Sequence, residues 1–181
     1  MLGIDPGSRI TGYGVIQFSG NQSTHLASGC IKIASGELGE RLETIYDGVT
    51  AVIAEFGPEE LAIERVFVHR NADSALKLGQ ARGAALLASV RNGLSVSEYA
   101  PNQIKKSVVG RGHADKAQMQ HMTRVLLGLR TEPTVDAADA LAVAICHAHL
   151  REHVQRQAQA LLDEPRRATS SSRSSHRWTK A

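Results

Sequence analysis

The sequence predicts a single α/β domain in which helices flank a mixed five-stranded sheet. Three observations predict this fold class. Residues 1–36 contain three strand-like segments with no helix between them, whereas two later strand-like segments are separated by helical periodicity. The 181 residues, 42% of them apolar, suit one hydrophobic core. Strands joined by short turns pair antiparallel and strands joined through a helix pair in parallel, so both kinds of pairing are expected.

The first part of the chain is expected to form an antiparallel set of strands. An apolar run at residues 2–4 meets the turn sequence Asp-Pro-Gly-Ser at 5–8, and strand-like residues resume at 11–18. A Gly-Asn pair suited to a hairpin then precedes a third strand at 25–33.

The rest of the chain is expected to alternate helices with two strands, in an order of the type βββαβαβαα. From residue 37 apolar side chains recur at steps of three and four until a Gly-Pro pair, which predicts an amphipathic helix over 37–56. The remaining elements are expected to be a strand at 61–66, a helix at 72–91, a strand at 95–99, a helix that begins at Pro101, a helix at 114–129 and a long final helix at 135–162.

Composition divides the chain into one domain and a tail. Residues 1–162 form the expected folded domain, and residues 163–181 are expected to be a disordered basic Ser/Arg-rich tail because they lack apolar periodicity. The longest apolar stretch, 140–146, is far too short to span a bilayer, and Asp5 interrupts any export signal. Two cysteines without CxxC spacing suit a reducing compartment, so a cytoplasmic location without membrane association is expected.

Charge is distributed unevenly along the chain. The net charge is +3, but residues 65–130 hold eleven basic and three acidic side chains, a net +8, while residues 1–64 have a net charge of −6. A basic surface beside a carboxylate site is expected of a protein that binds a polyanion with the help of a divalent metal. A set of solvated helix faces would give the same charge pattern, so charge leaves both interpretations open.

Four acidic residues occupy unusual places in the pattern. Asp5 ends an apolar strand, and Glu64 lies within the apolar segment LAIERV. Asp136 and Asp139 interrupt the apolar start of the last helix, where their spacing of three places both on one face. Carboxylates that converge at a sheet edge would suit Mg²⁺ or Mn²⁺ and the two-metal hydrolysis of phosphodiesters. Helix capping and an Asx turn are the structural alternatives.

Four segments then carry a resemblance to a known family. They are LGIDPGSRITGYG at 2–14, IERVF at 63–67, NADSALKLGQARG at 71–83 and DAADALA at 136–142. Over about residues 2–150 the chain resembles the RuvC-type Holliday junction resolvases, and the segments follow the family's order.

The resemblance implies an RNase H-like fold and a symmetric homodimer that makes paired symmetric nicks in a four-way DNA junction. It implies hydrolysis with Mg²⁺, two ions per subunit with Mn²⁺ as a substitute, in homologous recombination and DNA repair. It also implies a branch-migration motor of the RuvA–RuvB type as partner. The family's catalytic and metal-binding acids fall on Asp5, Glu64, Asp136 and Asp139.

Contacts with DNA are expected from the basic middle segment. The resemblance places the family's stacking aromatic on Phe67 and its DNA-contacting lysines on Lys105 and Lys116. Position and charge do not rank these lysines above their basic neighbours. The further DNA-binding candidates are Arg70, Lys77, Lys106, Arg111 and His113.

Two other functions and one packing question stay open. An RNase H-like nuclease acting on RNA would have a similar metal site, and a noncatalytic junction-binding protein would share the basic surface. The four retained acids argue against the second, because they weaken binding to a polyanion. Gly79 and Gly83, four apart on one helix, suggest close approach by another backbone, either from the sheet or across a dimer.

Overall fold

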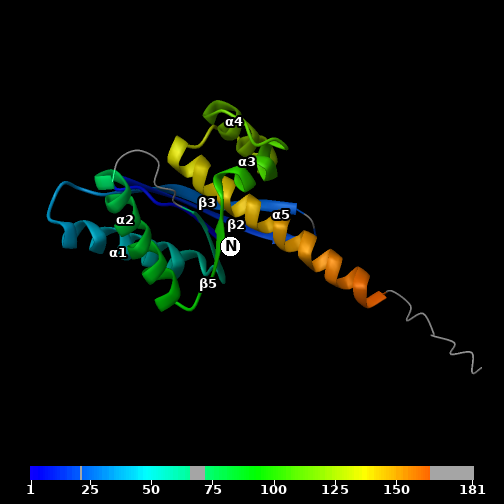
Figure 1. The fold of residues 1–181 in the computed structure, drawn as a ribbon, viewed down its shortest axis with the longest axis horizontal. Coiled ribbons are helices and arrows are strands. Elements are labelled where there is room, and N and C mark those ends of the chain that lie inside the picture. The colour runs from blue at the N-terminus through cyan, green and yellow to red at the C-terminus, as the bar shows by residue number, and fades with distance from the viewer. Residues whose placement is uncertain (21, 66–71, 164–181) are drawn as a thin grey trace, which may run out of the picture.

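The computed structural model describes residues 1–20, 22–65 and 72–163 (Figure 1). Within these residues the chain order is βββαβαβααα, and its last three helices are the ones expected from Pro101, at 114–129 and at 135–162. The strands are β1 (Leu2–Asp5), β2 (Ile10–Ser19), β3 (Gln22–Lys32), β4 (Glu60–Glu64) and β5 (Ser95–Tyr99). The helices are α1 (Leu38–Phe56), α2 (Ala72–Arg91), α3 (Pro101–Val109), α4 (Lys116–Leu126) and α5 (Val135–Asp163).

The observed bounds follow local chemistry. The expected helix at 72–91 and strand at 95–99 match α2 and β5 residue for residue. The α4 helix is shorter than the expected 114–129, because the Asp115 side chain accepts a hydrogen bond from the Gln118 amide at 2.8 Å and so caps the helix at its start. After α4, Gly128 adopts a left-handed backbone with φ of 61°. The α5 helix extends one residue past the expected end at 162.

The sheet is mixed, as the sequence predicts. Its strand order is β3-β2-β1-β4-β5, with antiparallel pairing of β1 with β2 and of β2 with β3. The strands β1 and β4 pair in parallel, as do β4 and β5. The parallel pairing brings the carboxyl ends of β1, β4 and β5 to the same edge.

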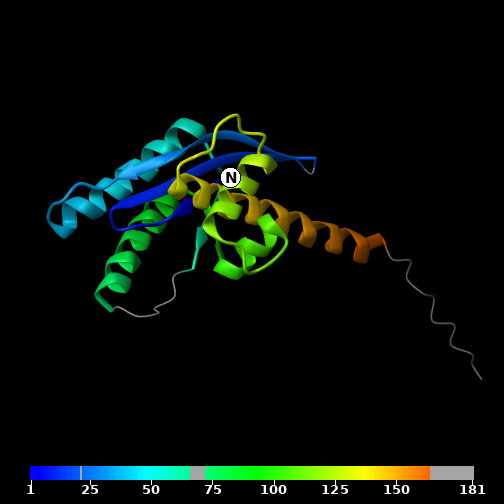
Figure 2. The same ribbon diagram turned by 90° about the horizontal axis from the view of Figure 1, so that it is seen from above.

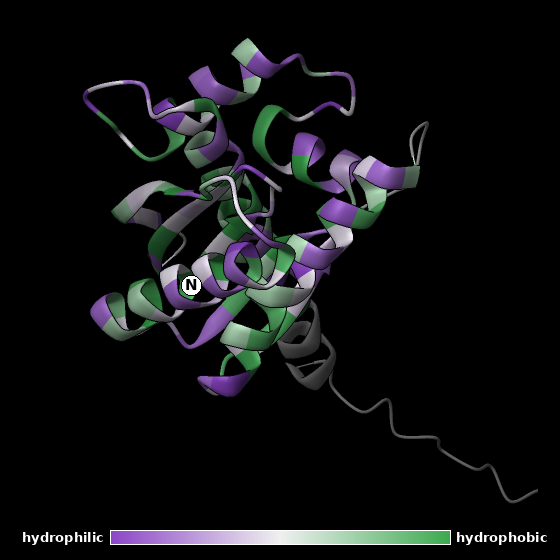
Figure 3. Cartoon of the chain, turned by 90° about the vertical axis from the view of Figure 1, so that its left-hand side faces the viewer, coloured by the Kyte–Doolittle hydropathy of each residue, from purple (hydrophilic) through white to green (hydrophobic). Residues whose placement is uncertain are grey.

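Helices cover both faces of the sheet and divide the core in two (Figures 1 and 2). On one face, α1 and α2 pack on side chains such as Ile4 and Ile63, which are fully buried. On the other face, α5 lies across the sheet, with α3 and α4 packed against it, around residues such as Ala62 and Leu141. Figure 3 shows how hydrophilic and hydrophobic residues are distributed over the helices and strands.

Glycines in β1 and β2 allow α5 to lie directly on the sheet. A Cβ atom built on Gly3 would come within 2.1 Å of the Ala140 carbonyl oxygen, and one on Gly12 within 2.0 Å of the Asp136 carbonyl oxygen. Neither distance is possible for a real side chain, so only glycine allows this packing. The close contact holds the first turns of α5 against the ends of β1 and β2.

The glycines of α2 do not make the close approach to the sheet that their spacing suggests. A Cβ atom on Gly79 or Gly83 would meet no described atom of this chain within 4 Å. The helix packs through its opposite side, where Ala81, Ala85 and Ala88 are almost fully buried. Of the two expected alternatives, approach to the sheet was therefore wrong and approach across a dimer stays a prediction, because spacing of four identifies a shared face but not the direction in which it points.

Candidate active site

Two acids meet where parallel strands end. Asp5 is the last residue of β1 and Glu64 the last of β4, and the two strands pair with Ile4 opposite Ile63. Side chains alternate along a strand, and Ile4 and Ile63 face α1 and α2. Asp5 and Glu64 therefore point to the other face, which α5 covers.

The first turns of α5 bring two further acids to this edge. The helix begins at Val135, and its early backbone is anchored by the bond from the Ala138 amide to the Thr134 carbonyl at 2.8 Å. Asp136 lies against Gly12, which is paired with Asp5 in the sheet. Asp139 follows one turn later on the same face. The glycine contact between β2 and α5 thus sets the position of both aspartates.

A pocket of about 380 Å³ opens between the sheet edge, α3, α4 and α5. Three of the predicted acids, Asp5, Glu64 and Asp139, line it together with Lys105 and Lys116. Apolar side chains such as Met119 of α4 complete its wall. Asp136 is not among the lining residues, although its charge acts on Asp5 and Asp139. The pocket therefore combines carboxylates and ammonium groups from five separate segments.

The carboxylates raise one another's pKa values. Burial, which has the largest effect, and the nearby charges of Asp139, Glu64 and Asp136 together raise the pKa of Asp5 to about 7. Burial and the charge of Asp139 also raise the pKa of Glu64. Burial raises the pKa of Asp139 as well, and Asp136 adds to this effect. Burial and mutual repulsion thus both disfavour the ionised forms of these acids.

Lys105 and Lys116 supply the opposing charge. Both lower the pKa values of Glu64 and Asp139, and Lys116 also lowers that of Asp5. Lys116 is the first residue of α4, so the capping bond of Asp115 fixes its backbone. The tertiary structure therefore separates these two lysines from their basic neighbours, which the sequence could not do.

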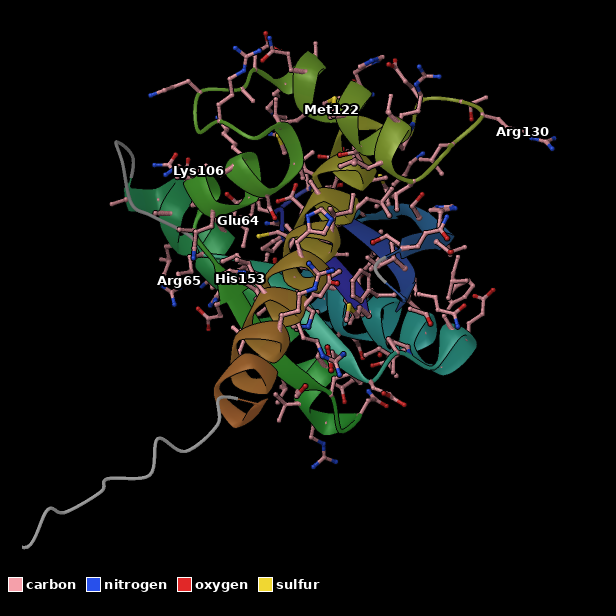
Figure 4. All side chains as sticks on the ribbon, turned by 90° about the vertical axis from the view of Figure 1, so that its right-hand side faces the viewer. Glu64, Arg65, Lys106, Met122, Arg130 and His153 are labelled. Atoms are coloured by element: carbon pink, nitrogen blue, oxygen red, sulfur yellow. The ribbon has the colours of Figure 1, made fainter. Side chains whose placement is uncertain are left out.

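The other predicted DNA contacts lie elsewhere. Lys106, on α3 and labelled in Figure 4, is exposed, as are Arg111 and His113, and none of the three lines the carboxylate pocket. Lys77 is also outside this pocket and forms an ion pair with Asp73 at 2.6 Å. Phe67 and Arg70 lie outside the described residues.

The donor set fits a divalent cation. Among residues 1–20, 22–65 and 72–163, no three His, Cys, Asp or Glu side chains stand in an arrangement that could hold a metal ion as they are. The carboxylates of the pocket nevertheless offer oxygen ligands of the kind that Mg²⁺ and Mn²⁺ prefer. Burial and three neighbouring acids raise the pKa of Asp5 to about 7, so positive charge placed beside it would favour its ionised form. A divalent ion would supply that charge.

Sequence reasoning missed an arginine that supports this edge. The Arg82 Nε atom of α2 donates a hydrogen bond to the Glu64 carbonyl oxygen at 3.3 Å, and its guanidinium pairs with Glu98 at 2.8 Å. Arg82 thereby holds the end of β4 from the far face of the sheet. No local pattern identifies this role, because the contact joins residues 18 positions apart.

It also missed a buried polar network between α5 and the sheet. His147, only 6% exposed, contacts the Tyr99 hydroxyl through Nδ1 and the Glu60 carboxylate through Nε2, each at 2.6 Å. Arg151 pairs with the other oxygen of Glu60 at 2.7 Å. The network connects α5 to both β4 and β5 and so stabilises the helix that carries two of the acids.

Comparison with known proteins identifies the family that the chain resembles. The family model described as crossover junction endodeoxyribonuclease RuvC matches residues 1–147. The RuvC protein of Aeromonas salmonicida is 56% identical over 177 residues, 98% of both chains. That of Marinobacter nauticus is 55% identical over 159 residues, 88% of this chain and 91% of the relative. The solved structure of Thermus thermophilus RuvC in complex with a Holliday junction substrate is 36% identical, with a TM-score of 0.80, and the match covers 84% of this chain and 94% of that one.

Proposed function

The chain belongs to the RuvC family of crossover junction endodeoxyribonucleases, and we infer from this membership that it resolves Holliday junctions. It has the RNase H-like fold of that family. The function is structure-selective hydrolysis of phosphodiesters in four-way junction DNA, in homologous recombination and repair, and it depends on a divalent metal. The observation that carries this function is the pocket where Asp5, Glu64 and Asp139 face Lys105 and Lys116.

We propose that Asp5, Glu64, Asp136 and Asp139 are the catalytic metal ligands. The mutual effect of these acids on their pKa values supports the proposal, because it indicates a site in need of positive charge. We propose Mg²⁺, two ions per subunit, with Mn²⁺ able to substitute. When bound, these ions supply an activated water and stabilise the leaving oxygen of an in-line phosphoryl displacement.

The two lysines of the pocket would hold the reacting phosphate. Their ammonium groups lower the pKa values of Glu64 and Asp139, so they lie close enough to act on charge in this pocket. Charge that develops on a phosphate oxygen during hydrolysis would be stabilised in the same way. Lys106, Arg111, His113 and Lys77 are proposed as contacts to the DNA away from the reacting group.

A homodimer would explain the exposed face of α2. Leu76, Gly79, Gly83, Leu87 and Val90 recur at steps of three and four and are exposed, Leu76 by 61% and Val90 by 59%. An apolar stripe with two glycines at its centre suits close packing against a second helix. We propose that this stripe is the dimer contact and that the dimer makes paired symmetric nicks.

Four further proposals rest on the sequence. Phe67 is proposed to stack at the branch point and Arg70 to contact DNA. Residues 1–162 are proposed to form the nuclease domain; residues 164–181 of the basic Ser/Arg-rich segment predicted at 163–181 lie outside the described residues. A motor of the RuvA–RuvB type is the proposed partner. A cytoplasmic location is the last. No helix in the described part of the chain is both long and apolar enough to cross a membrane.

The test is cleavage of a synthetic four-way junction with Mg²⁺, beside a linear duplex and an RNA-containing duplex. The variants are Asp139→Asn and, as a matched control, Asp47→Asn, which removes an exposed carboxylate on α1. Symmetric nicks in the junction alone, retained by the control and lost in Asp139→Asn while junction binding persists, support the function and the site.

Other outcomes would contradict specific parts of the proposal. Tight junction binding without cleavage by the wild type would favour a noncatalytic binding protein. Cleavage of the RNA strand would favour an RNA nuclease. Loss of both binding and cleavage in Asp139→Asn would mean that the acid is structural.

A further inference from the structure

A second pocket, with a basic lining, opens beside the loop that follows Asp5 and joins β1 to β2. It has a volume of about 690 Å³ and is lined by the loop between β1 and β2, the segment between β3 and α1, and the starts of α1 and α2. Figure 1 shows these segments at the end of the molecule where α5 also begins. Its polar lining consists of three cations and three hydroxyls: Arg9, Arg41, Lys77, Ser8, Ser35 and Ser74.

The wall of this pocket is held in place by specific contacts. The Arg41 guanidinium donates a hydrogen bond to the Ser8 carbonyl oxygen at 2.6 Å. The Arg9 carbonyl oxygen accepts one from the Ile33 amide at 2.9 Å. Thr11 contacts both the amide and the carbonyl of Gly7, at 3.4 and 3.2 Å. The loop is thus fixed before any ligand binds, which lowers the entropic cost of binding.

The charge of the pocket is positive. None of the described residues that line it is acidic. Three carboxylates are next to lining residues in the sequence. Asp73 pairs with Lys77 of the lining at 2.6 Å, Glu40 accepts a hydrogen bond from the Glu37 amide at 3.1 Å, and Glu37 is the N-cap of α1. The lining side chains themselves thus carry three positive charges, of which Asp73 offsets that of Lys77. None of the described lining residues is aromatic, so the pocket offers donors for phosphates rather than a platform for bases.

We propose that this pocket is a second phosphate-binding subsite, which holds the backbone of the DNA strand on one side of the cleavage point. The proposal rests on the function proposed above. Asp5 and Arg9 are four peptide steps apart, so their Cα atoms lie within about 14 Å of each other. Phosphates along a duplex strand follow at about 3.4 Å of axis per nucleotide. A strand whose reacting phosphate lies beside Asp5 therefore reaches the pocket within about four nucleotides.

The subsite would act on register and affinity. A phosphate held by Arg9 and Arg41 limits how far the strand can slide along the carboxylate pocket, because Asp5 of that pocket and Arg9 of the second one are joined by a single fixed loop. Phosphate contacts of this kind position a duplex without reading its sequence. The pocket is thus expected to strengthen binding equally for junctions of different sequence.

The test uses the full-length protein with the variants Arg9→Gln and Lys77→Gln, singly and together. Arg91→Gln is the matched control, because Arg91 is an exposed cation at the opposite end of α2, about 21 Å from Lys77. Arg41 is kept, since its loss would also release the Ser8 carbonyl. Junction affinity is measured from 50 to 200 mM salt, with junctions in which single linkages near the cleavage point are neutral methylphosphonates.

The double variant is expected to bind junctions about tenfold more weakly than Arg91→Gln, with a salt slope smaller by about 1 for each phosphate interaction that the substitutions remove. In the wild type, a neutral linkage within about four nucleotides of the cleavage point should weaken binding, and this effect should disappear in the double variant.

Equal affinity and salt slope for the double variant and the control would overturn the subsite. So would a neutral-linkage effect that persists unchanged in the double variant. If the double variant lost the stabilisation of its fold by inorganic phosphate while its junction affinity equalled that of the control, the pocket would be a site for a free anion instead of DNA. In each of these cases wild-type cleavage of the junction would stand, whereas absence of junction cleavage by the wild type would overturn the proposed function itself.

Discussion

Replacing Asp5 with asparagine is expected to stabilise the metal-free protein at neutral pH. The pKa of Asp5 is raised from 3.8 to about 7 by burial and by three neighbouring acids. The folded state therefore binds a proton more tightly than the unfolded chain, and wild-type stability falls as the pH rises from about 4 to 7. Three units of pKa correspond to about 4 kcal/mol, which is fully lost above pH 7.

The assay is urea unfolding at pH 4 to 8 with EDTA and a fixed protein concentration. Asparagine has no charge to bury, so the stability of Asp5→Asn relative to wild type should increase across this range by up to about 4 kcal/mol. An unsatisfied amide would cost about 1–3 kcal/mol at every pH and would not change this trend. Asp47→Asn, on the exposed side of α1, is the control for removal of one carboxylate.

A constant difference between Asp5→Asn and wild type from pH 4 to 8 would refute this reasoning. Mg²⁺ provides a second readout, because an ion that binds only the folded site stabilises it by mass action. Stabilisation by Mg²⁺ should be clear in the wild type and much smaller in Asp5→Asn. Equal stabilisation of both proteins would remove Asp5 from the metal site.

Three further predictions concern the packing and charge around the site. Gly12→Ala should destabilise the protein by about 1–3 kcal/mol in thermal unfolding and strongly reduce cleavage, because its Cβ would overlap the backbone of α5. Gly79→Ala, which has open space around it, should change stability by at most about 1 kcal/mol. Equal effects of the two substitutions would contradict the contact between Gly12 and α5. Lys116→Gln should reduce the rate of single-turnover cleavage about a hundredfold. It should also move the acidic limb of the pH–rate profile to higher pH, since the lysine lowers the pKa values of Asp5 and Asp139. An unchanged profile would argue against a role of Lys116 in the pocket. Tyr99→Phe should lower the free energy of unfolding by about 1–3 kcal/mol, because it leaves Nδ1 of His147 unpaired. Junction affinity should stay at the wild-type value. Loss of affinity would indicate that Tyr99 contacts DNA directly.

Local pattern was enough to predict most of the fold. The apolar period of α1 and the Gly-Pro pair after it define that helix, and α2 and β5 have the bounds that the sequence predicts. These features are readable because helix periodicity, turns and caps depend on residues within a few positions of each other.

The sequence also predicts the four acids as site residues, for a related reason. A carboxylate such as Asp5 or Glu64 within an apolar run has no local partner, so its presence indicates a function. The motif around each acid then specified the family. The sequence pattern could not provide the electrostatic environment of the site, since the pKa of Asp5 depends on the charges of three acids that are distant in the chain.

Contacts between distant segments were decided by the tertiary structure alone. Lys105 and Lys106 are neighbours in sequence, yet only Lys105 lines the carboxylate pocket, because adjacent residues of a helix point about 100° apart. Gly12 and Gly79 are equivalent by composition, yet only Gly12 meets another backbone. Arg9 and Arg41 lie in an acidic segment of the sequence and still line a basic pocket with Lys77. Charge and packing depend on distances in space. Folding brings together groups that are far apart in the sequence, so their spatial distance cannot be read from their separation along the chain.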